Sequence, residues 1–407
     1  MSTLPAAERN DLDRVRRWSL GVGVVALVIC VIGAFFDPAQ FFCSYLAAYL
    51  FWQGIALGCL AILMVYHLTG GAWGLLIRRF LEAGTWTIPL LALLFIPVGC
   101  GLWYLYLWAR PDRVAADPKL QWKQVYLNVP FWWLRAIIYF VLWTALTWFL
   151  NTWSRREDAT GDPRIQGRLA RLSAFGLVVF GVCMHFAAVD WIMSLQPDFR
   201  SSIFGPLMVS RQVLSGLALM LVVMTWLADR PPLRDLLSVE ALGDLGNLLL
   251  TFLIIWAYMA FFQFMLIWIA NLPFEVIWYL DRTRGGWRWV AWALIVFGFA
   301  VPFFLLLQRP VKRNPANLRW VAGLVLFMQL VFTDFQVLPA FFTTSIAEHW
   351  MDFLMPLGVG GIWFAFFLRV LKSRPLVARH DVNQPSAVRL RRMDAEAAER
   401  EAAISHG

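Results

Sequence analysis

The chain has 407 residues, of which 60% are hydrophobic and only 15% are Asp, Glu, Lys or Arg. Soluble domains carry about 25% charged residues, so this composition excludes a soluble globular fold. The net charge of +9 is spread over short loops between apolar segments. That distribution is typical of membrane topology and excludes a nucleic-acid partner as its explanation.

Ten apolar segments predict ten transmembrane helices. A hydrocarbon core of about 30 Å needs about 20 residues at about 1.5 Å rise per residue, and each segment is about this long. In chain order, the predicted spans cover residues 18–36, 40–66, 87–108, 130–150, 172–193, 206–227, 246–270, 288–308, 318–340 and 350–370. The predicted fold is therefore an all-α polytopic membrane protein.

A weak internal repeat predicts how the spans are grouped. Long connections follow spans 2 and 6, and His185 and Asp190 in span 5 have the same spacing as Gln329 and Asp334 in span 9. Duplicated halves of this kind recur in transporters. We therefore expect two four-helix bundles, made of spans 2–5 and 6–9 and flanked by spans 1 and 10.

The predicted organisation has three parts. They are an N-terminal segment (1–17), a membrane domain (18–371) and a basic, disordered tail (372–407). Within the membrane domain, span 1 (18–39) is followed by the first bundle (40–193), the second bundle (206–340) and span 10 (350–370). The first apolar run lacks a small-residue cleavage site, so it is predicted to stay as a span and not to be removed as a signal peptide.

The distribution of Lys and Arg predicts the orientation of the chain. With the N-terminus in the cytoplasm, 24 Lys and Arg lie in the cytoplasmic segments or at the span ends that adjoin them, and 8 lie in or beside the loops on the opposite side. Loops rich in positive charge stay on the cytoplasmic side. Both termini are therefore predicted to be cytoplasmic.

Ligands for a cofactor are scarce. The five cysteines lie in or at the edges of spans without a C-x-x-C pair, which excludes an iron–sulfur cluster or an attached haem c held by this chain. His185 is the one histidine deep in a span, whereas a transmembrane haem b needs two at matched depth. The chain is therefore predicted to bind no metal or redox cofactor of its own.

His185, Asp190, Arg211 and Asp334 are the candidate functional residues, because ionisable groups inside a membrane usually face the interior of the bundle. Helix rise places all four in the outer half of the spans, and the cytoplasmic half is predicted to be nearly free of charge. Asp190 is expected to be neutral or to pair with a cation such as Arg211. Two alternatives stay open: Arg211 snorkels to the outer head groups, or His185 is a neutral core residue bonded to a backbone carbonyl.

Four segments carry a resemblance to a known family. They are residues 67–82, 123–135, 190–205 and 263–282, which include the motifs Asp-Trp-x-Met-Ser-Leu and Ile-Trp-x-x-Asn-Leu-Pro. Over about residues 15–375 the chain resembles the NrfD/PsrC-like family of ten-span, quinone-associated membrane proteins. Within that family it is most similar to the F subunits of bacterial alternative complex III, a quinol:cytochrome c oxidoreductase.

The resemblance implies a location in the bacterial inner membrane and quinol or quinone as a substrate. It also implies that the cofactors belong to partner chains. These partners are a periplasmic iron–sulfur subunit, a multihaem and a monohaem cytochrome c, and a paralogous ten-span membrane subunit, in addition to membrane lipids. The expected function is quinol binding or proton transfer on the periplasmic side of a respiratory or photosynthetic electron-transfer chain.

The expected function assigns roles to eight residues. The predicted proton acceptors from quinol are Asp190 and His185, the predicted relay or ion-pair groups are Arg211, Asp334 and Glu275, and the predicted partner-docking residues are Trp278, Arg282 and Asp198. One alternative is a structural or proton-conducting subunit whose quinol site lies in the paralogous chain. An alternative from another class is a secondary transporter with duplicated halves.

A phosphatase reporter fused after Gly161 tests the orientation. The loop between spans 4 and 5 carries five arginines, so it is predicted to be cytoplasmic, where the reporter is inactive. A fusion after Gly205, in the next loop, should be active. High activity at Gly161 would reverse the orientation and move all the candidate residues to the cytoplasmic side.

Overall fold

The computed structural model of the chain describes residues 6–230, 233–342 and 349–376. The regular structure in this part of the chain is helical, with no strand among these residues. Ten of the helices, two of them composite, are long and apolar enough to cross a membrane. The prediction of an all-α, multi-pass membrane protein is confirmed. Most of the predicted tail lies outside the described residues.

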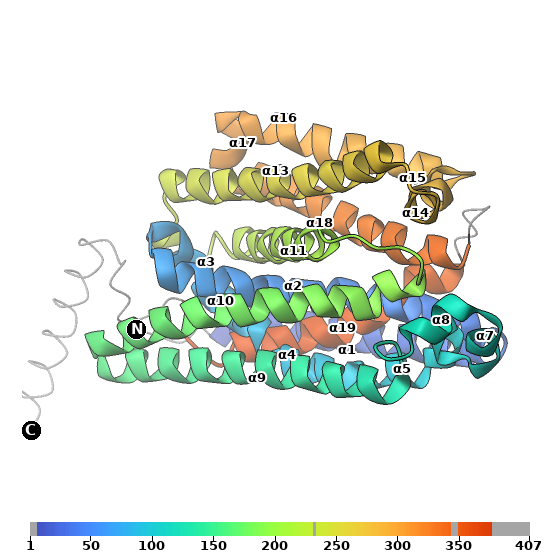
Figure 1. Ribbon diagram of the computed structural model, residues 1–407. Coiled ribbons are helices and arrows are strands. Elements are labelled where there is room, and N and C mark those ends of the chain that lie inside the picture. Colours follow the sequence, from blue (N-terminus) through green and yellow to red (C-terminus); the bar gives the residue numbers. More distant parts are fainter. Residues whose placement is uncertain (1–5, 231–232, 343–348, 377–407) are drawn as a thin grey trace, which may run out of the picture.

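The spans follow one another along the chain (Figure 1). They are α1 (Ala6–Ala34), α2 (Pro38–Thr69), a third span made of α3 (Ala72–Thr85), α4 (Ile88–Leu94) and α5 (Ile96–Cys100), α9 (Val129–Thr160), α10 (Pro163–Trp191), α11 (Phe204–Trp226), α13 (Val239–Ala270), an eighth span containing α15 (Trp287–Ala293) and α16 (Val301–Leu307), α18 (Pro315–Val337) and α19 (Trp350–Leu371). The connections hold α6 (Leu102–Leu105), α7 (Pro111–Ala116), α8 (Pro118–Lys123), α12 (Leu233–Leu236), α14 (Pro273–Thr283) and α17 (Arg309–Arg313).

Several spans begin with the same local signal, an Asp or Asn followed at once by Pro. The side chains of Asp37, Asp162 and Asn314 accept hydrogen bonds from backbone N–H groups in the first turns of α2, α10 and α18. The proline at the first helical position has no N–H group to satisfy and its φ already suits a helix. These three boundaries are therefore fixed by local sequence.

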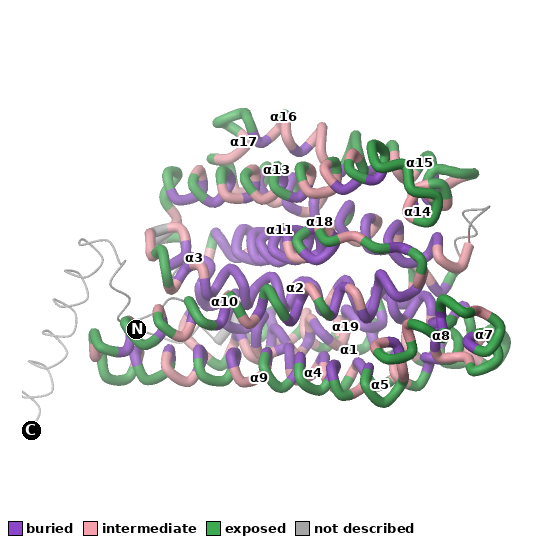
Figure 2. Tube along the Cα trace, viewed as in Figure 1, coloured by how far each residue is buried: buried purple, intermediate pink, exposed green. Residues whose placement is uncertain are grey.

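α2 and α11 form the centre of the molecule, and both are buried along most of their length (Figure 2). α2 packs against α3 and α10, while α9 contacts α10 and α4 and closes the first bundle. α11 packs against α13 and α18, and α13 contacts α16, which closes the second bundle. α19 packs on α2, and α1 packs along α19. The spans are thus arranged as two bundles flanked by spans 1 and 10.

The molecule has two ends that carry different groups. α1 begins and α19 ends at one end, which we call the terminal face, and an ion pair between Asp13 and Lys372 joins them there. α7, α8 and α14 lie at the opposite end, which we call the loop face (Figure 1). In the predicted topology the terminal face is cytoplasmic and the loop face is periplasmic.

Glycines allow α2 and α11 to cross closely. A Cβ atom added to Gly58 would lie 1.9 Å from the carbonyl oxygen of Gln212, and one added to Gly54 would lie 2.7 Å from Nη2 of Arg211. Small residues serve this purpose between membrane helices because they let two backbones approach. The crossing therefore brings Arg211 and Gln212 against the backbone of α2.

The third span differs from its prediction. It runs over Trp73–Cys100, whereas the sequence predicts residues 87–108. Arg78, Arg79 and Glu82 give this segment the look of a polar loop, but all three are buried in ion pairs within α3. The predicted boundary is wrong because a hydropathy window counts each charge in full, even where two charges neutralise one another inside the protein.

Replacing Gly58 with Val should prevent the close crossing, because the backbone of Gln212 leaves no room for a Cβ atom. We expect most of the solubilised protein to elute as aggregate and the remainder to melt at a lower temperature. Gly181→Ala on α10 is the matched control, since an added Cβ there meets nothing within 4 Å, and it should leave stability unchanged or raise it by about 1 kcal/mol. A Gly58→Val protein as stable as the control would contradict the tight crossing.

Candidate functional site

Asp190 and Arg135 form a buried ion pair near the loop face. Asp190 is the penultimate residue of α10, and Arg135 lies in the second turn of α9. Nε and Nη2 of Arg135 donate to the two carboxylate oxygens of Asp190, each at 2.8 Å. Asp190 has no exposed surface. A bidentate contact of this kind adds strength and fixes the orientation of both groups.

Further contacts complete the ion pair. The hydroxyl of Tyr139 donates to Asp190 at 2.8 Å, and Arg135 donates to the carbonyl of Tyr126 at 3.0 Å and lies 3.9 Å from the centre of its ring. Three side-chain hydrogen bonds thus hold the carboxylate. This arrangement favours an anchor between α9 and α10 over a mobile proton acceptor, and it contradicts the expectation that Asp190 pairs with Arg211.

Arg211 lies in the core where α2, α11 and α18 meet. Its side chain is almost completely buried, with 1% of the residue exposed. Nη1 donates to Oγ1 of Thr333 at 2.8 Å, and Nη2 donates to the carbonyl of Leu50 at 3.2 Å. The alternative that Arg211 snorkels to the head groups is therefore wrong. Both acceptors are uncharged, so neither contact balances the charge of Arg211.

Three buried glutamines lie beside these residues. Gln53 precedes Gly54 and Gln212 follows Arg211. The backbone carbonyl of Gln329 accepts a hydrogen bond from the hydroxyl of Thr333. Among the described residues, Nε2 of Gln53, Oε1 of Gln212 and both side-chain polar atoms of Gln329 have no hydrogen-bond partner. Buried polar atoms are nearly always satisfied by protein or water, so these atoms are places where water or a polar ligand can bind. Sequence reasoning from charged residues misses them, although amide side chains inside apolar spans were a visible signal.

His185 lies on the α10 side of this core. It is partly buried, and its ring faces the start of α11, because a Cβ atom added to Gly205 would lie 2.4 Å from Nδ1. The sulfur of the preceding residue, Met184, accepts a hydrogen bond from Nε2 of Gln212 at 3.6 Å. His185 therefore faces the first turn of α11, six residues before Arg211.

Asp334 lies on the α18 side of the same core. It is partly buried and follows Thr333, the residue that accepts from Arg211. Its carboxylate is within electrostatic range of the Cys43 thiol near the start of α2. Of the four predicted intramembrane candidates, His185 lies where α10 packs on α11, Arg211 bonds to α18 through Thr333, Asp334 follows Thr333 on α18, and Asp190 is held by α9.

Trp278 and Arg282 on α14 are buried, which contradicts their predicted role in docking a partner. Arg282 donates to the carbonyls of Phe335 at 3.0 Å and Gln336 at 2.7 Å. Its guanidinium carbon lies 3.3 Å from the centre of the Trp278 ring, and burial lowers the pKa of Arg282 to about 9. Trp278 in turn stacks on Phe199, with ring centres 4.1 Å apart. The two residues fasten α14 to the end of α18.

Glu275 and Asp198 remain near the surface of the loop face. Glu275 lies in the first turn of α14, where the helix dipole favours a carboxylate, and not at the end of a span as the sequence suggests. Asp198 is exposed and pairs with Lys119 at 3.5 Å. Asp198 is therefore accessible to a partner, and its docking role stays a prediction.

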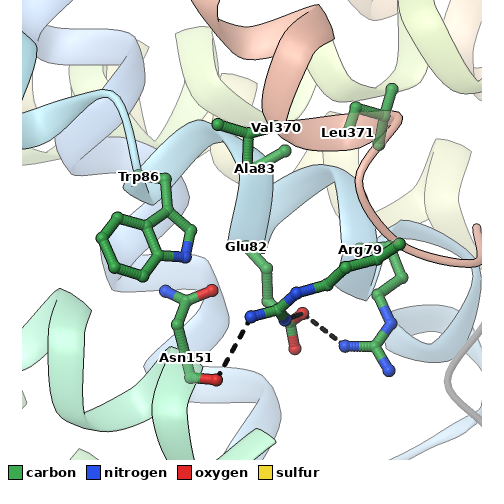
Figure 3. Close-up of a pocket in the computed structure, with 8 residues that line it drawn as sticks. Arg79, Glu82, Ala83, Trp86, Asn151, Val370 and Leu371 are labelled. Carbon is green, nitrogen blue, oxygen red and sulfur yellow. Dashed lines mark hydrogen bonds and ion pairs between the residues drawn. The ribbon is translucent and has the colours of Figure 1, made fainter. Parts of the chain in front are cut away.

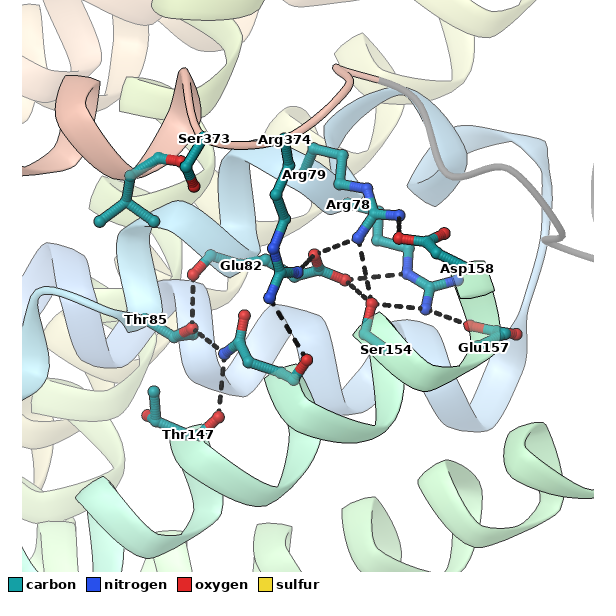
Figure 4. Close-up of polar contacts among 12 residues, drawn as sticks. Arg78, Arg79, Glu82, Thr85, Thr147, Ser154, Glu157, Asp158, Ser373 and Arg374 are labelled. Carbon is teal, nitrogen blue, oxygen red and sulfur yellow. Dashed lines mark hydrogen bonds and ion pairs between the residues drawn. The ribbon is translucent and has the colours of Figure 1, made fainter. Parts of the chain in front are cut away.

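A second ionic network lies near the terminal face (Figure 4), and its residues fall in the segments between or after the predicted spans. Glu82 of α3 is at its centre and is 2% exposed. Its carboxylate pairs with Arg78 at 3.1 Å, Arg79 at 2.5 Å and Arg374 at 2.9 Å, and it accepts a hydrogen bond from Ser154 at 2.6 Å. Arg374 follows the end of α19, so the network joins α3, α9 and α19.

The remaining charges of this network come from α9. Glu157 pairs with Arg78 at 2.5 Å, and Asp158 pairs with Arg79. Three arginines thus face three carboxylates. All of these residues fall outside the predicted spans, in segments predicted to be cytoplasmic, so the expectation that the cytoplasmic half of the spans is nearly free of charge stays a prediction.

A shallow pocket opens beside this network (Figure 3), with about 210 Å³ of empty space including its open mouth. Its walls come from α3, α9 and the end of α19. The lining residues are Arg79, Glu82, Ala83, Trp86, Asn151 and Arg374, together with the last two residues of α19. The pocket therefore combines charged, aromatic and apolar groups at the terminal face.

No protein-family model and no curated protein matches the chain. Within the described residues, no group of three or more His, Cys, Asp and Glu side chains could hold a metal ion. The chain is accordingly a multi-pass membrane protein with ten spans, a polar core around Arg211 and ionic networks near both faces.

Replacing Arg135 with Met should destabilise the protein by about 3–5 kcal/mol, because it leaves the carboxylate of Asp190 buried without its cation. The double variant Arg135→Met/Asp190→Leu should recover much of this loss. Arg113→Met is the control, since its ion pair with Asp112 is exposed and contributes about 0–1 kcal/mol. Thermal unfolding in detergent measures the difference, and an Arg135→Met protein that melts with the control would show that the pair is not structural.

Proposed function

We propose that the chain is an integral membrane subunit of a quinol:cytochrome c, or quinol:acceptor, oxidoreductase complex of the bacterial inner membrane. Its own contribution is proton transfer through the polar core around Arg211. Two lines support the proposal. Residues 190–205 and 263–282 resemble quinone-associated membrane subunits, and the core combines a buried guanidinium with amide atoms that have no partner among the described residues.

The position of Arg211 carries the proposal. Burying one ion costs several kcal/mol unless polar groups solvate it, and here its two acceptors are a hydroxyl and a carbonyl. Water bound to the neighbouring amides of Gln53, Gln212 and Gln329 would supply the missing solvation and a path for protons.

His185 and Asp334 are the groups that exchange protons in this proposal. They lie on α10 and α18, both of which pack against the helix that carries Arg211. An imidazole and a carboxyl group can each accept and release a proton. Protons would therefore move between the two groups.

The ion pair between Asp190 and Arg135 supports a division of labour with a partner chain. Because three hydrogen bonds fix this carboxylate, we assign quinol oxidation to the paralogous ten-span subunit and electron transfer to the iron–sulfur and cytochrome subunits. These partners would meet the chain at the loop face, where Asp198 is accessible.

A secondary transporter is the alternative from another class. Its duplicated halves would carry broken helices at matched positions. In this chain the interruptions fall in the third span, between α3, α4 and α5, and in the eighth span, where the π-helix Leu294–Ala300 separates α15 from α16. The third span is the second helix of its bundle, whereas the eighth is the third helix of the other. The mismatch favours the oxidoreductase subunit.

The complex should be purified through a tag on this chain from its native membrane. We expect c-type haem absorbance to accompany the chain, because it would carry cytochrome partners. Asp334→Asn and His185→Gln should assemble fully but lower quinol:cytochrome c turnover by about 10²–10⁴-fold, the usual effect of losing one group from proton transfer. Arg171→Met, which changes an exposed arginine of α10, is the control.

Each arm of this experiment can contradict the proposal. A chain that elutes alone and colourless would support a transporter. Complexes with full subunit content and wild-type turnover and proton yield in both variants would assign proton transfer to another subunit and leave this chain a structural role.

A further inference from the structure

The pocket at the terminal face is separate from the core around Arg211, and the proposed function does not use it. Its wall on α3 includes Trp86, and its wall on α9 includes Asn151. Figure 3 shows the indole nitrogen of Trp86 turned toward Asn151. The pocket ends at Val370 and Leu371, the last residues of the tenth span, so it lies at the boundary between hydrocarbon and head groups.

Three polar atoms of the lining residues are buried and unpartnered within the described part of the chain. They are Nε1 of Trp86, Nε of Arg79 and Oδ1 of Asn151. Arg79 is 3% exposed and Asn151 is 0% exposed. Such atoms cost stability unless a ligand or water satisfies them. The pocket therefore offers two N–H donors and one acceptor.

The orientation of the Asn151 amide is fixed by its own contacts. Nδ2 donates to the backbone carbonyl of Thr147 and to Oγ1 of Thr85, each at 2.9 Å. A carbonyl oxygen can only accept, so the nitrogen must occupy this position. Oδ1 is thus the acceptor on the pocket side of the amide, and a ligand that satisfies it needs an O–H or N–H donor.

The charge around the pocket favours an anion. The network itself is balanced, but Arg155, an exposed residue one turn after Asn151, lies over the Trp86 ring at 5.4 Å from its centre. This adds a positive charge beside the donors. Burial lowers the pKa of Arg374, and the nearby Arg79 and Arg155 lower it further, against the opposing effect of Glu82. A bound anion would relieve that repulsion.

We propose that this pocket binds the head group of an anionic glycerophospholipid whose head carries free hydroxyls. The phosphate oxygens accept from Trp86 and face Arg155, and a head-group hydroxyl donates to Oδ1 of Asn151. The glycerol and the first acyl carbons lie along Val370 and Leu371. A basic pocket between helix ends at the head-group level is a recurrent form of lipid recognition.

Native mass spectrometry of the delipidated full-length chain in detergent tests the site. The probes are dioleoyl phosphatidylglycerol, dioleoyl phosphatidylcholine and glycerol 3-phosphate. We expect one tight phosphatidylglycerol that binds at least about tenfold more weakly to Trp86→Phe, since this variant keeps the ring but removes a hydrogen bond to a charged group. Arg155→Gln, at an exposed position that folding tolerates, should weaken binding similarly. Trp148→Phe and Arg156→Gln, exposed neighbours on α9, should bind as the wild type does.

Three results would overturn the proposal. Equal binding of phosphatidylcholine would show that the site does not select an anionic head. Full competition by glycerol 3-phosphate at the lipid's own concentration would identify a site for a free phosphate compound and not for a lipid. Wild-type binding by both Trp86→Phe and Arg155→Gln would place the bound lipid elsewhere on the protein.

Discussion

Hydrocarbon offers no hydrogen bonds, so polar groups between the spans depend on one another or on internal water. This constraint accounts for the way α9 is held. Near the loop face, its Arg135 and Tyr139 donate hydrogen bonds to Asp190 of α10. Near the terminal face, its Glu157 pairs with Arg78 of α3. α9 lies at the edge of the molecule (Figure 1). Apolar side chains contact lipid about as well as they contact another helix, so apolar packing alone does not fix the position of α9. The two polar contacts set its depth and its rotation.

The polar groups of the protein separate into two kinds by how completely they are satisfied. The carboxylates of Asp190 and Glu82 are each held by opposite charge and by several hydrogen bonds, which suits a fixed structure. The region of Arg211 differs, because uncharged acceptors and unpartnered glutamine atoms surround a single guanidinium. Only the second kind leaves capacity for water or protons to bind and move. This contrast, and not the mere presence of charge in a span, separates anchors from candidates for function.

Sequence alone predicts the ten spans, because each needs only a long apolar stretch. It does not predict how each helix is rotated about its axis, and therefore which side chains contact one another. Helix rise predicts a similar depth for Asp190 and Arg211, yet Asp190 pairs with Arg135, since the rotation of a helix follows from packing that hydropathy does not contain. Burial of Trp278 is missed for a related reason, because a short outer helix folds back onto the end of α18. The close crossing at Gly58, by contrast, was visible as a Gly-x-x-x-Gly spacing in span 2 and would have located the core.

The partnership of α1 with α19 has a consequence for biogenesis. Oγ of Ser19 donates to the carbonyl of Gly361 at 3.0 Å across 342 residues of sequence, and the backbones approach so closely that a Cβ atom on Gly23 would lie 2.9 Å from Gly361. Translation at about 5–20 residues per second separates the two helices by about 20–70 s. During this interval the first span lacks its main neighbour, and lipid or an insertion chaperone must cover the face that carries Ser19 and Gly23 until the last span arrives.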